Sequence, residues 1–385
     1  MAFVPRDVSA ALAGACFAPD YASARARFRA AAARAGARVD VFVNDVATGP
    51  DGGSLSTDVA VVGPADATSA LLVVSGTHGP EGFVGSAAQV ALLDAIAAGA
   101  SVPPVRIVLV HAINAYGFAH ITRTTEHNVD LNRNFIDWSA GAPANPAYAE
   151  LHDALCPSVW TPEALAAADG ARTAWIDRKG HDAFVDMTSR GQYTHPDGLN
   201  YGGSGPEWAH RALEVIVRRH LSTAARIALI DWHTALGERG EPFFLCFNDP
   251  EGPGWQRACR WWGRDRVETS GGFGGAARPR YTGLLFHGVQ RYAAHADVIG
   301  AVIEFGTVPI DDARRALQAD RYLRFGDGAA SDPRRGALRE QVLEAFSPQS
   351  TDWKRSVLGH AIAIQHATLV GLADWSRTPT APGSG

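Results

Sequence analysis

Seven short stretches of the chain have the apolar pattern of β-strands. Residues 71–74 are all apolar and read as a strand buried on both faces, as inside a parallel sheet. Residues 39–43 alternate apolar and polar positions, which is typical of a strand with one exposed face. The remaining strands are predicted at residues 58–63, 105–111, 227–233, 242–247 and 298–305.

Helical patterns lie between and after these strands. The Ala- and Arg-rich residues 21–35 predict a helix that Asp20 caps and that stops at Gly36. Further helices are expected at residues 83–93, 311–325, 334–346 and 352–375, and in several pieces between 146 and 190. Strands that alternate with helices favour an α/β fold with a mixed, largely parallel central sheet. We expect residues 1–375 to form one domain, with residues 376–385 a disordered tail.

The amino-acid composition and net charge indicate which classes of partner the protein is not expected to bind. The chain has 385 residues, of which 46% are hydrophobic and 19% charged, so it can form a sizeable core. Its net charge is −5 and it has no long basic run, so we expect neither nucleic acid nor an anionic membrane as a partner. The oligomeric state leaves no mark on the sequence.

The cysteine content and the N-terminal sequence favour a location in the cytoplasm. Its four cysteines form no closely spaced pair, which fits a reducing compartment, although pairing between distant ones stays open. The N-terminal residues lack the layout of a signal peptide, and no apolar run of about 18 residues is evident. We therefore expect a soluble protein in the cytoplasm.

Candidate chemistry begins where the strand at 71–74 ends. His78 and Glu81 stand three residues apart in a Gly- and Pro-rich turn, just before a predicted helix. In open α/β sheets, ligands bind beyond the carboxyl ends of the strands. An imidazole and a carboxylate on one tight turn can bind one zinc ion, although a surface pair without a ligand is the other interpretation.

Two further strands end in residues of the same kind. His233 closes the strand at 227–233, and Glu304 lies at the end of the strand at 298–305. Two histidines and Glu81 would leave zinc an open position for water, and Glu304 is our candidate for accepting that water's proton. A hydrogen-bonded core histidine and a buried ion pair are the alternative interpretations of His233 and Glu304.

The loop after the strand at 105–111 carries possible substrate-binding groups. Arg123 and Arg133 lie ten residues apart, with Asn132 beside the second. Arginine can bind a carboxylate with two parallel hydrogen bonds, and hydrolysis of an amide requires positive groups for the developing oxyanion. An ordinary solvated loop is the alternative.

Together these motifs resemble the zinc carboxypeptidase superfamily. The matching elements are His78-Gly79-Pro80-Glu81, Asp130-Leu131-Asn132-Arg133-Asn134-Phe135, His233 and Glu304-Phe305-Gly306-Thr307. The superfamily includes carboxypeptidase A type enzymes and the succinylglutamate desuccinylase and aspartoacylase branch. Residues 191–203 and the 304–307 ending look most similar to a little-characterised bacterial subfamily of it.

The resemblance implies a role for each position. His78, Glu81 and His233 would bind zinc, and Glu304 would act as general base and then acid. Arg123 would stabilise the oxyanion, and Asn132 and Arg133 would hold a substrate carboxylate. The tyrosine that closes over substrate in carboxypeptidases has four possible counterparts, which are Tyr193, Tyr201, Tyr281 and Tyr292.

From these roles we expect a zinc-dependent hydrolase of amide bonds in substrates that bear a free carboxylate, namely a carboxypeptidase-type metallopeptidase acting on peptides. The alternative is a deacylase of small N-acyl amino acids. An alternative of another class is a metal-free binding protein that keeps the fold.

Overall fold

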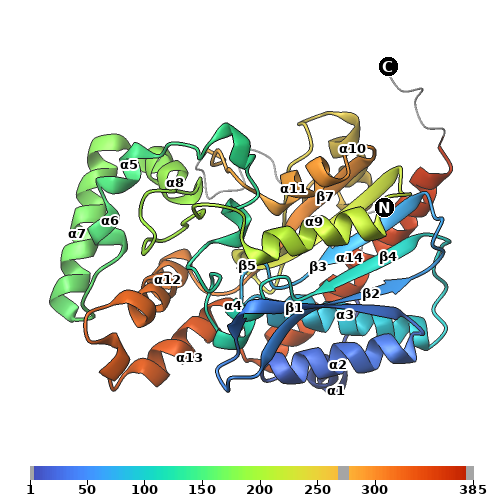
Figure 1. Ribbon diagram of the computed structural model, residues 1–385, viewed down its shortest axis with the longest axis horizontal. Helices are drawn as coiled ribbons and strands as arrows, with labels where there is room; N and C mark the ends of the chain where they lie inside the picture. Colours follow the sequence, from blue (N-terminus) through green and yellow to red (C-terminus); the bar gives the residue numbers. More distant parts are fainter. Residues whose placement is uncertain (1–3, 268–276, 379–385) are drawn as a thin grey trace.

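A seven-stranded sheet runs through the middle of the molecule in the computed structural model, which describes residues 4–267 and 277–378 (Figure 1). Its strands are Arg38–Thr48 (β1), Ser54–Val62 (β2), Ser69–Val74 (β3), Arg106–His111 (β4), Arg226–Arg239 (β5), Pro242–Cys246 (β6) and Asp297–Gly306 (β7). They lie in the order β1-β2-β4-β3-β5-β7-β6. The four inner strands β4, β3, β5 and β7 are parallel, whereas β2 and β6 run antiparallel to their inner neighbours. The predicted mixed, largely parallel sheet is confirmed.

The strand at the centre of the sheet is β3. It pairs in parallel with β4 on one side and β5 on the other, and all six of its residues are buried. Its near-continuous apolar sequence is explained by this position, because neither face of the strand meets solvent. The carboxyl ends of β3, β5 and β7 therefore lie at one edge of the sheet.

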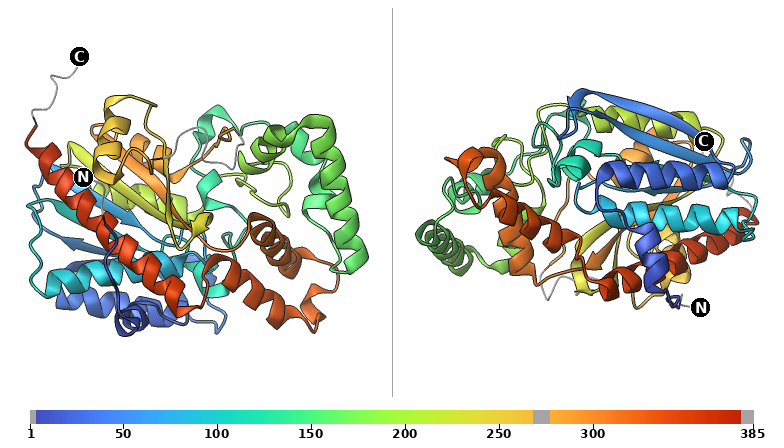
Figure 2. Two further views of the ribbon diagram at one scale, coloured as in Figure 1. Left: turned by 180° about the vertical axis from the view of Figure 1, so that it is seen from behind. Right: turned by 90° about the horizontal axis from the view of Figure 1, so that it is seen from below.

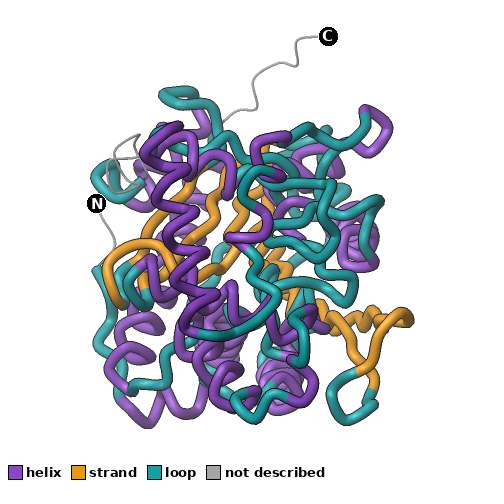
Figure 3. Tube along the Cα trace, turned by 90° about the vertical axis from the view of Figure 1, so that its left-hand side faces the viewer, coloured by secondary structure: helices purple, strands orange, loops and turns teal. Residues whose placement is uncertain are grey.

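Helices cover both faces of the sheet, so that the orange strands in Figure 3 run between purple helices. One face is covered by α1 (Ala10–Cys16), α2 (Tyr21–Arg34), α3 (Gly82–Ala97), α10 (Pro253–Trp262) and α14 (Thr351–Ser376). Figure 2 shows α2, α3 and α14 side by side across this face. The opposite face is covered by α9 (Trp208–His220) and α11 (Leu285–Tyr292).

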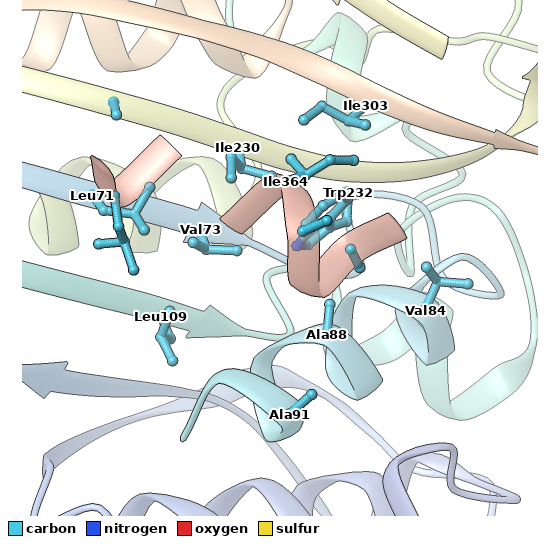
Figure 4. Close-up of a cluster of buried hydrophobic side chains, with 14 of the residues drawn as sticks. Leu71, Val73, Val84, Ala88, Ala91, Leu109, Ile230, Trp232, Ile303 and Ile364 are labelled. Carbon is cyan, nitrogen blue, oxygen red and sulfur yellow. The ribbon is translucent and has the colours of Figure 1, made fainter. Parts of the chain in front are cut away.

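Alternation along the strands supplies the core on each face. On the face of α3 and α14, Ile230 and Trp232 of β5 pack with Val84 and Ile364 of the two helices (Figure 4). Each such side chain, fully buried, contributes roughly 1.5–3 kcal/mol from removal of apolar surface from water. The intervening β5 residues point to the other face, where Leu229 joins the core beneath α9 and α11.

The remaining helices gather near the edge where the parallel strands end (Figure 1). They are α4 (Ala115–His120), α5 (Pro146–Ala149), α6 (His152–Leu155), α7 (Pro162–Lys179), α8 (His181–Ser189), α12 (Ile310–Phe325) and α13 (Arg335–Phe346). Three short 3₁₀ helices complete the described elements, at Leu131–Arg133 (η1), Trp138–Ala140 (η2) and Ala329–Ser331 (η3). The helices predicted between 146 and 190 are confirmed as α5 to α8. Most of the predicted disordered tail lies outside the described residues.

Helix α14 departs from the expectation that the chain contains no long apolar stretch. By length and composition, the region Arg335–Ser376 includes a window apolar enough to cross a membrane, and 67% of that window is buried in the structure. A helix packed inside a soluble protein meets the same criterion. The burial comes from packing of α14 against α3 and α10 on one face of the sheet.

A buried histidine at the end of β4 gives the fold a pH dependence. His111 is fully buried, its Nε2 lies 2.9 Å from Ser86 Oγ, and its ring stacks on Phe28. Burial lowers the pKa of His111 to about 3. Below pH 6.5 the unfolded chain therefore takes up a proton that the folded chain refuses until about pH 3, and stability falls as the pH decreases across this window.

Replacing His111 with Gln is expected to weaken this acid sensitivity. The shift corresponds to about 4–5 kcal/mol lost between pH 6.5 and 3 in the wild type. Urea unfolding at pH 7 and at pH 4 measures the difference for each protein, with the exposed His366→Gln variant as control. An equal pH dependence in the His111 variant and the wild type would contradict the assignment.

Candidate metal centre

The turn between β3 and α3 is held in a fixed shape by its neighbours. His78 and Glu81 lie on this turn, and α3 begins at Gly82 directly after it. A Cβ atom on Gly79 would lie only 2.0 Å from the backbone of Gly117, so the turn approaches α4 too closely for any larger residue. The Gly79 amide donates to the Arg123 carbonyl at 3.3 Å. The glycine in the predicted motif therefore serves close packing beside the candidate ligands.

The three predicted ligands form one compact buried group. Nδ1 of His78 lies 3.2 Å from Nδ1 of His233, although the residues are 155 positions apart. Glu81 Oε1 lies 2.9 Å from Nδ1 of His78, and Glu81 Oε2 lies 3.1 Å from Nδ1 of His233. The Thr234 amide also donates to Glu81 Oε2, which fixes the carboxylate in place. The fold thus brings together the residues that the sequence proposes as one site.

A carboxylate lies behind each histidine. Nε2 of His78 is 3.0 Å from Asp130 Oδ1, and Nε2 of His233 is 2.9 Å from Asp231 Oδ2. Both aspartates are buried. A proton on each Nε2 satisfies these contacts and leaves both Nδ1 atoms with lone pairs that face the centre of the group.

This arrangement suits a cation. Two imidazole lone pairs and a carboxylate that face one another repel unless a proton or a metal ion lies among them. Burial alone would lower the pKa of His233, but Asp231 and Glu81 raise it well above its usual value. The protein therefore favours positive charge at this position, and two nitrogens with one carboxylate oxygen are a donor set that zinc accepts.

Arg123 binds two carboxylates beside the ligand group. Its NH1 lies 3.2 Å from Glu81 Oε1, and its Nε and NH2 donate to Asp130 Oδ2 at 3.3 and 3.1 Å. Burial alone would raise the pKa of Asp130, but Arg123 and His78 hold it well below its usual range. The structure therefore places the predicted oxyanion-binding arginine at the site, engaged with two carboxylates.

Glu304 lies beside His233 on the same face of the sheet. The two residues are register partners in the parallel pair of β5 and β7, so their side chains project to the same side. Burial and the charge of Glu81 raise the pKa of Glu304 to about 8. The Leu236 amide lies 3.5 Å from Glu304 Oε2, and among the described residues no cation forms an ion pair with this carboxylate. The ion-pair interpretation of Glu304 is therefore not what the described part of the chain shows.

Asn132 and Arg133 lie next to the group on η1, but their polar atoms serve the surrounding structure. Asn132 Oδ1 accepts from the Leu285 amide at the start of α11. Arg133 donates to the carbonyls of Ser189 and Asn132, and its guanidinium stacks on the ring of Tyr281. Within residues 4–267 and 277–378, neither side chain forms a hydrogen bond or ion pair with His78, Glu81 or His233.

The candidate tyrosines have structural partners, and so does His195, which lies in the segment 191–203. Tyr193 donates to the Arg133 carbonyl at 2.6 Å, and Tyr292 lies 2.6 Å from His210. His195 stacks on the ring of His152. Of the four tyrosines, Tyr193 and Tyr281 are those that contact Arg133.

The sequence alone assigns no role to two members of the site, Asp130 and Asp231. Asp130 lies in the motif at residues 130–135, and Asp231 lies in the predicted strand at 227–233. The second had a usable signal, because residues two apart on a strand share a face and Asp231 precedes His233 by two positions.

A second group of possible ligands lies at the surface. Donor atoms of Glu126, His127 and Glu207 fall within 4.8 Å of one another. The His127 side chain is 63% exposed, and such exposed acidic groups are common without an ion. The burial of the His78 group distinguishes it from this cluster.

The match to a protein family covers most of the chain. Residues 17–360 match the model of a protein family of unknown function, DUF2817. The chain belongs to this family. No curated protein matches the chain. Family membership leaves the activity open, so the chemistry has to be inferred from the site.

Several solved structures resemble this DUF2817 protein at low identity. A putative metallopeptidase from Shewanella baltica is 12% identical, with 91% of this chain and 92% of that chain covered and a TM-score of 0.42. Carboxypeptidase A from Helicoverpa armigera is 14% identical, covering 90% and 73%, with a TM-score of 0.43. Succinylglutamate desuccinylase from Chromobacterium violaceum is 16% identical, covering 84% and 74%, with a TM-score of 0.36.

These neighbours are the kinds of protein that the motif resemblance names. They include carboxypeptidase A-like proteins, putative metallopeptidases and succinylglutamate desuccinylases. Because the TM-scores lie below 0.5 and the identities below 25%, the function proposed next rests on the geometry of the site.

Proposed function

We propose that this DUF2817 protein is a zinc-dependent hydrolase that cleaves an amide bond in substrates with a free carboxylate, and that peptides cleaved at their C-terminus are the substrates. One observation carries the proposal. Nδ1 of His78, Nδ1 of His233 and the carboxylate of Glu81 converge on one buried point, with Glu304 on the neighbouring strand.

The residues would divide the chemistry among them. His78, Glu81 and His233 would hold zinc, which when bound lowers the pKa of a water molecule to about 7 and polarises a carbonyl. Glu304 would accept the proton of the attacking water and deliver it to the leaving amine. Its burial beside apolar strand residues suits this exchange, because a carboxylate without an ion-pair partner accepts a proton readily.

Arginine and amide groups would orient the substrate. Arg123 would polarise the scissile carbonyl through NH1, the nitrogen that contacts Glu81 in this structure. Asn132 and Arg133 would hold the free carboxylate of the substrate. Arg133 donates to two backbone carbonyls through Nε and NH1, and its NH2 group, which has no hydrogen bond within the described residues, could make that contact.

The substrate class can be tested by release of amine. Purified, zinc-loaded protein is assayed on N-blocked dipeptides, on the same dipeptides with an amidated C-terminus, and on N-acyl amino acids. We expect hydrolysis of the free-acid dipeptides, with the amidated set at least tenfold slower, because the carboxylate loses its charged hydrogen bonds.

Two other results of this assay would point to a different function. Faster turnover of N-acyl amino acids would replace peptides with small acylated substrates and make the protein a deacylase. Inactivity on all three sets, combined with the absence of bound metal, would favour a binding protein that keeps the fold.

A further inference from the structure

The buried pair of Asp231 and Thr77 joins the two chain segments that carry the candidate ligands. Asp231 lies on β5 two residues before His233, and Thr77 immediately precedes His78 in the turn after β3. The Thr77 hydroxyl donates to Asp231 Oδ1 at 2.7 Å, and both side chains are buried. The bond therefore links the turn of His78 and Glu81 to the strand of His233.

The other oxygen of Asp231 faces His233. Asp231 Oδ2 and His233 Nε2 lie 2.9 Å apart as an ion pair, and neither atom has a hydrogen-bond partner of regular geometry among the residues that the structure describes. Leaving either of two such buried polar atoms unpaired is costly, so a proton between them is the arrangement that satisfies both. That proton resides on Nε2, which leaves the lone pair of His233 on Nδ1, the atom that faces His78 and Glu81.

We propose that Asp231, aimed by the Thr77 hydroxyl, is a positioning residue that fixes the tautomer and orientation of His233 for metal binding. The inference rests on the proposed function only in requiring that this group binds a metal. It adds that the spacing between the two ligand-bearing segments depends on the bond from Thr77 to Asp231. Because Val74 and Asp231 are register partners in the β3–β5 pair, the bond acts where the paired part of β3 has just ended.

Zinc affinity is the measurement that tests this proposal. Zinc binding is followed by competition with a chromophoric chelator for wild type, Asp231→Asn, Thr77→Val and Thr77→Ser. We expect Asp231→Asn to bind zinc roughly 10–100-fold more weakly, the range typical for loss of a carboxylate behind a ligand histidine. Thr77→Val should bind more weakly than wild type, whereas Thr77→Ser, which keeps the hydroxyl, should restore the affinity.

A matched control separates positioning from general loss of stability. Asp58 is another fully buried aspartate, paired with Arg25 on the neighbouring helix α2. Asp58→Asn should lower the melting temperature while leaving the zinc affinity of the folded protein unchanged. Long-range ¹⁵N correlation spectra of the histidine rings provide a second readout, with the proton of His233 expected on Nε2 in the wild type.

The outcomes distinguish this inference from the proposed function. If wild type binds zinc and the folded Asp231→Asn variant binds it equally tightly, the positioning role is wrong and the metal site stands. If wild type binds no zinc, the proposed function is wrong, and the positioning role is wrong with it. Should Asp231→Asn not fold, equal zinc affinity of Thr77→Val and wild type would overturn the inference, and a deficit that Thr77→Ser repairs would support it.

Discussion

Replacing Glu304 with Gln is expected to lower kcat by about 10²–10⁴-fold while the protein keeps its zinc. The amide has nearly the same shape as the carboxyl group but cannot accept a proton from water. Glu304 lies beside His233 in the sheet but is not one of the three converging ligands, so its loss should leave metal binding intact. Steady-state kinetics on the preferred substrate and metal content of the same sample measure both effects.

Glu238→Gln provides the matched control for this variant. Glu238 is an exposed glutamate near the end of β5 and should be replaceable without loss of rate. Wild-type turnover in Glu304→Gln would remove Glu304 from the mechanism. Loss of the metal together with the rate would instead make Glu304 a ligand.

Replacing His233 with Ala is expected to abolish stoichiometric zinc binding. The variant removes one of three donor atoms and leaves Asp231 as a buried carboxylate without its imidazole partner. The affinity should therefore fall by more than the roughly 100-fold that loss of an outer partner can cause. Equilibrium dialysis against buffered zinc measures the remaining affinity, and thermal unfolding reports whether the variant is folded.

His210→Ala is the control for this second prediction. His210 is also buried, but it packs against Phe135 and Tyr292 and forms no hydrogen bond to His78 or Glu81. It should lose stability and keep one zinc ion per chain. Stoichiometric zinc of unchanged affinity in folded His233→Ala would show that the metal is bound elsewhere.

The strands could be predicted because burial leaves a direct mark on their sequences. A strand such as β3, covered on both faces, must be apolar throughout, and its limits follow from the polar turns around it. The end of β5 was less predictable. Its last residues, from Gly237 to Arg239, are exposed, and they follow an irregularity at which Ala235 and Arg239 both pair with Gly306, the last residue of β7.

The helix α9 is not among the predicted elements, although its sequence has a clear amphipathic pattern. Ala209, Leu213 and Ile216 recur at helical spacing and face the core, and basic residues end the helix. The helices α10 and α11 are amphipathic too, but they span only 10 and 8 residues, so the pattern repeats too few times to mark them clearly. They are anchored by packing on the sheet, which a single sequence does not reveal.

The ligand group was predictable from position, whereas the supporting residues required the fold. His78, Glu81 and His233 stand at ends of strands, and parallel strands bring such ends to one edge of a sheet. The side-chain directions of Asn132 and Arg133 depend on α11 and on the carbonyl of Ser189, which lie more than fifty residues away in sequence. No local pattern encodes these contacts.

The most direct test of the metal centre is anomalous X-ray scattering from crystals of the zinc-loaded protein. Data collected on either side of the zinc absorption edge locate the ion without reference to activity. The account predicts one strong peak per chain, within coordination distance of Nδ1 of His78, Nδ1 of His233 and the carboxylate of Glu81. No peak at that position in zinc-loaded crystals, or a single peak at another group of residues, would contradict it.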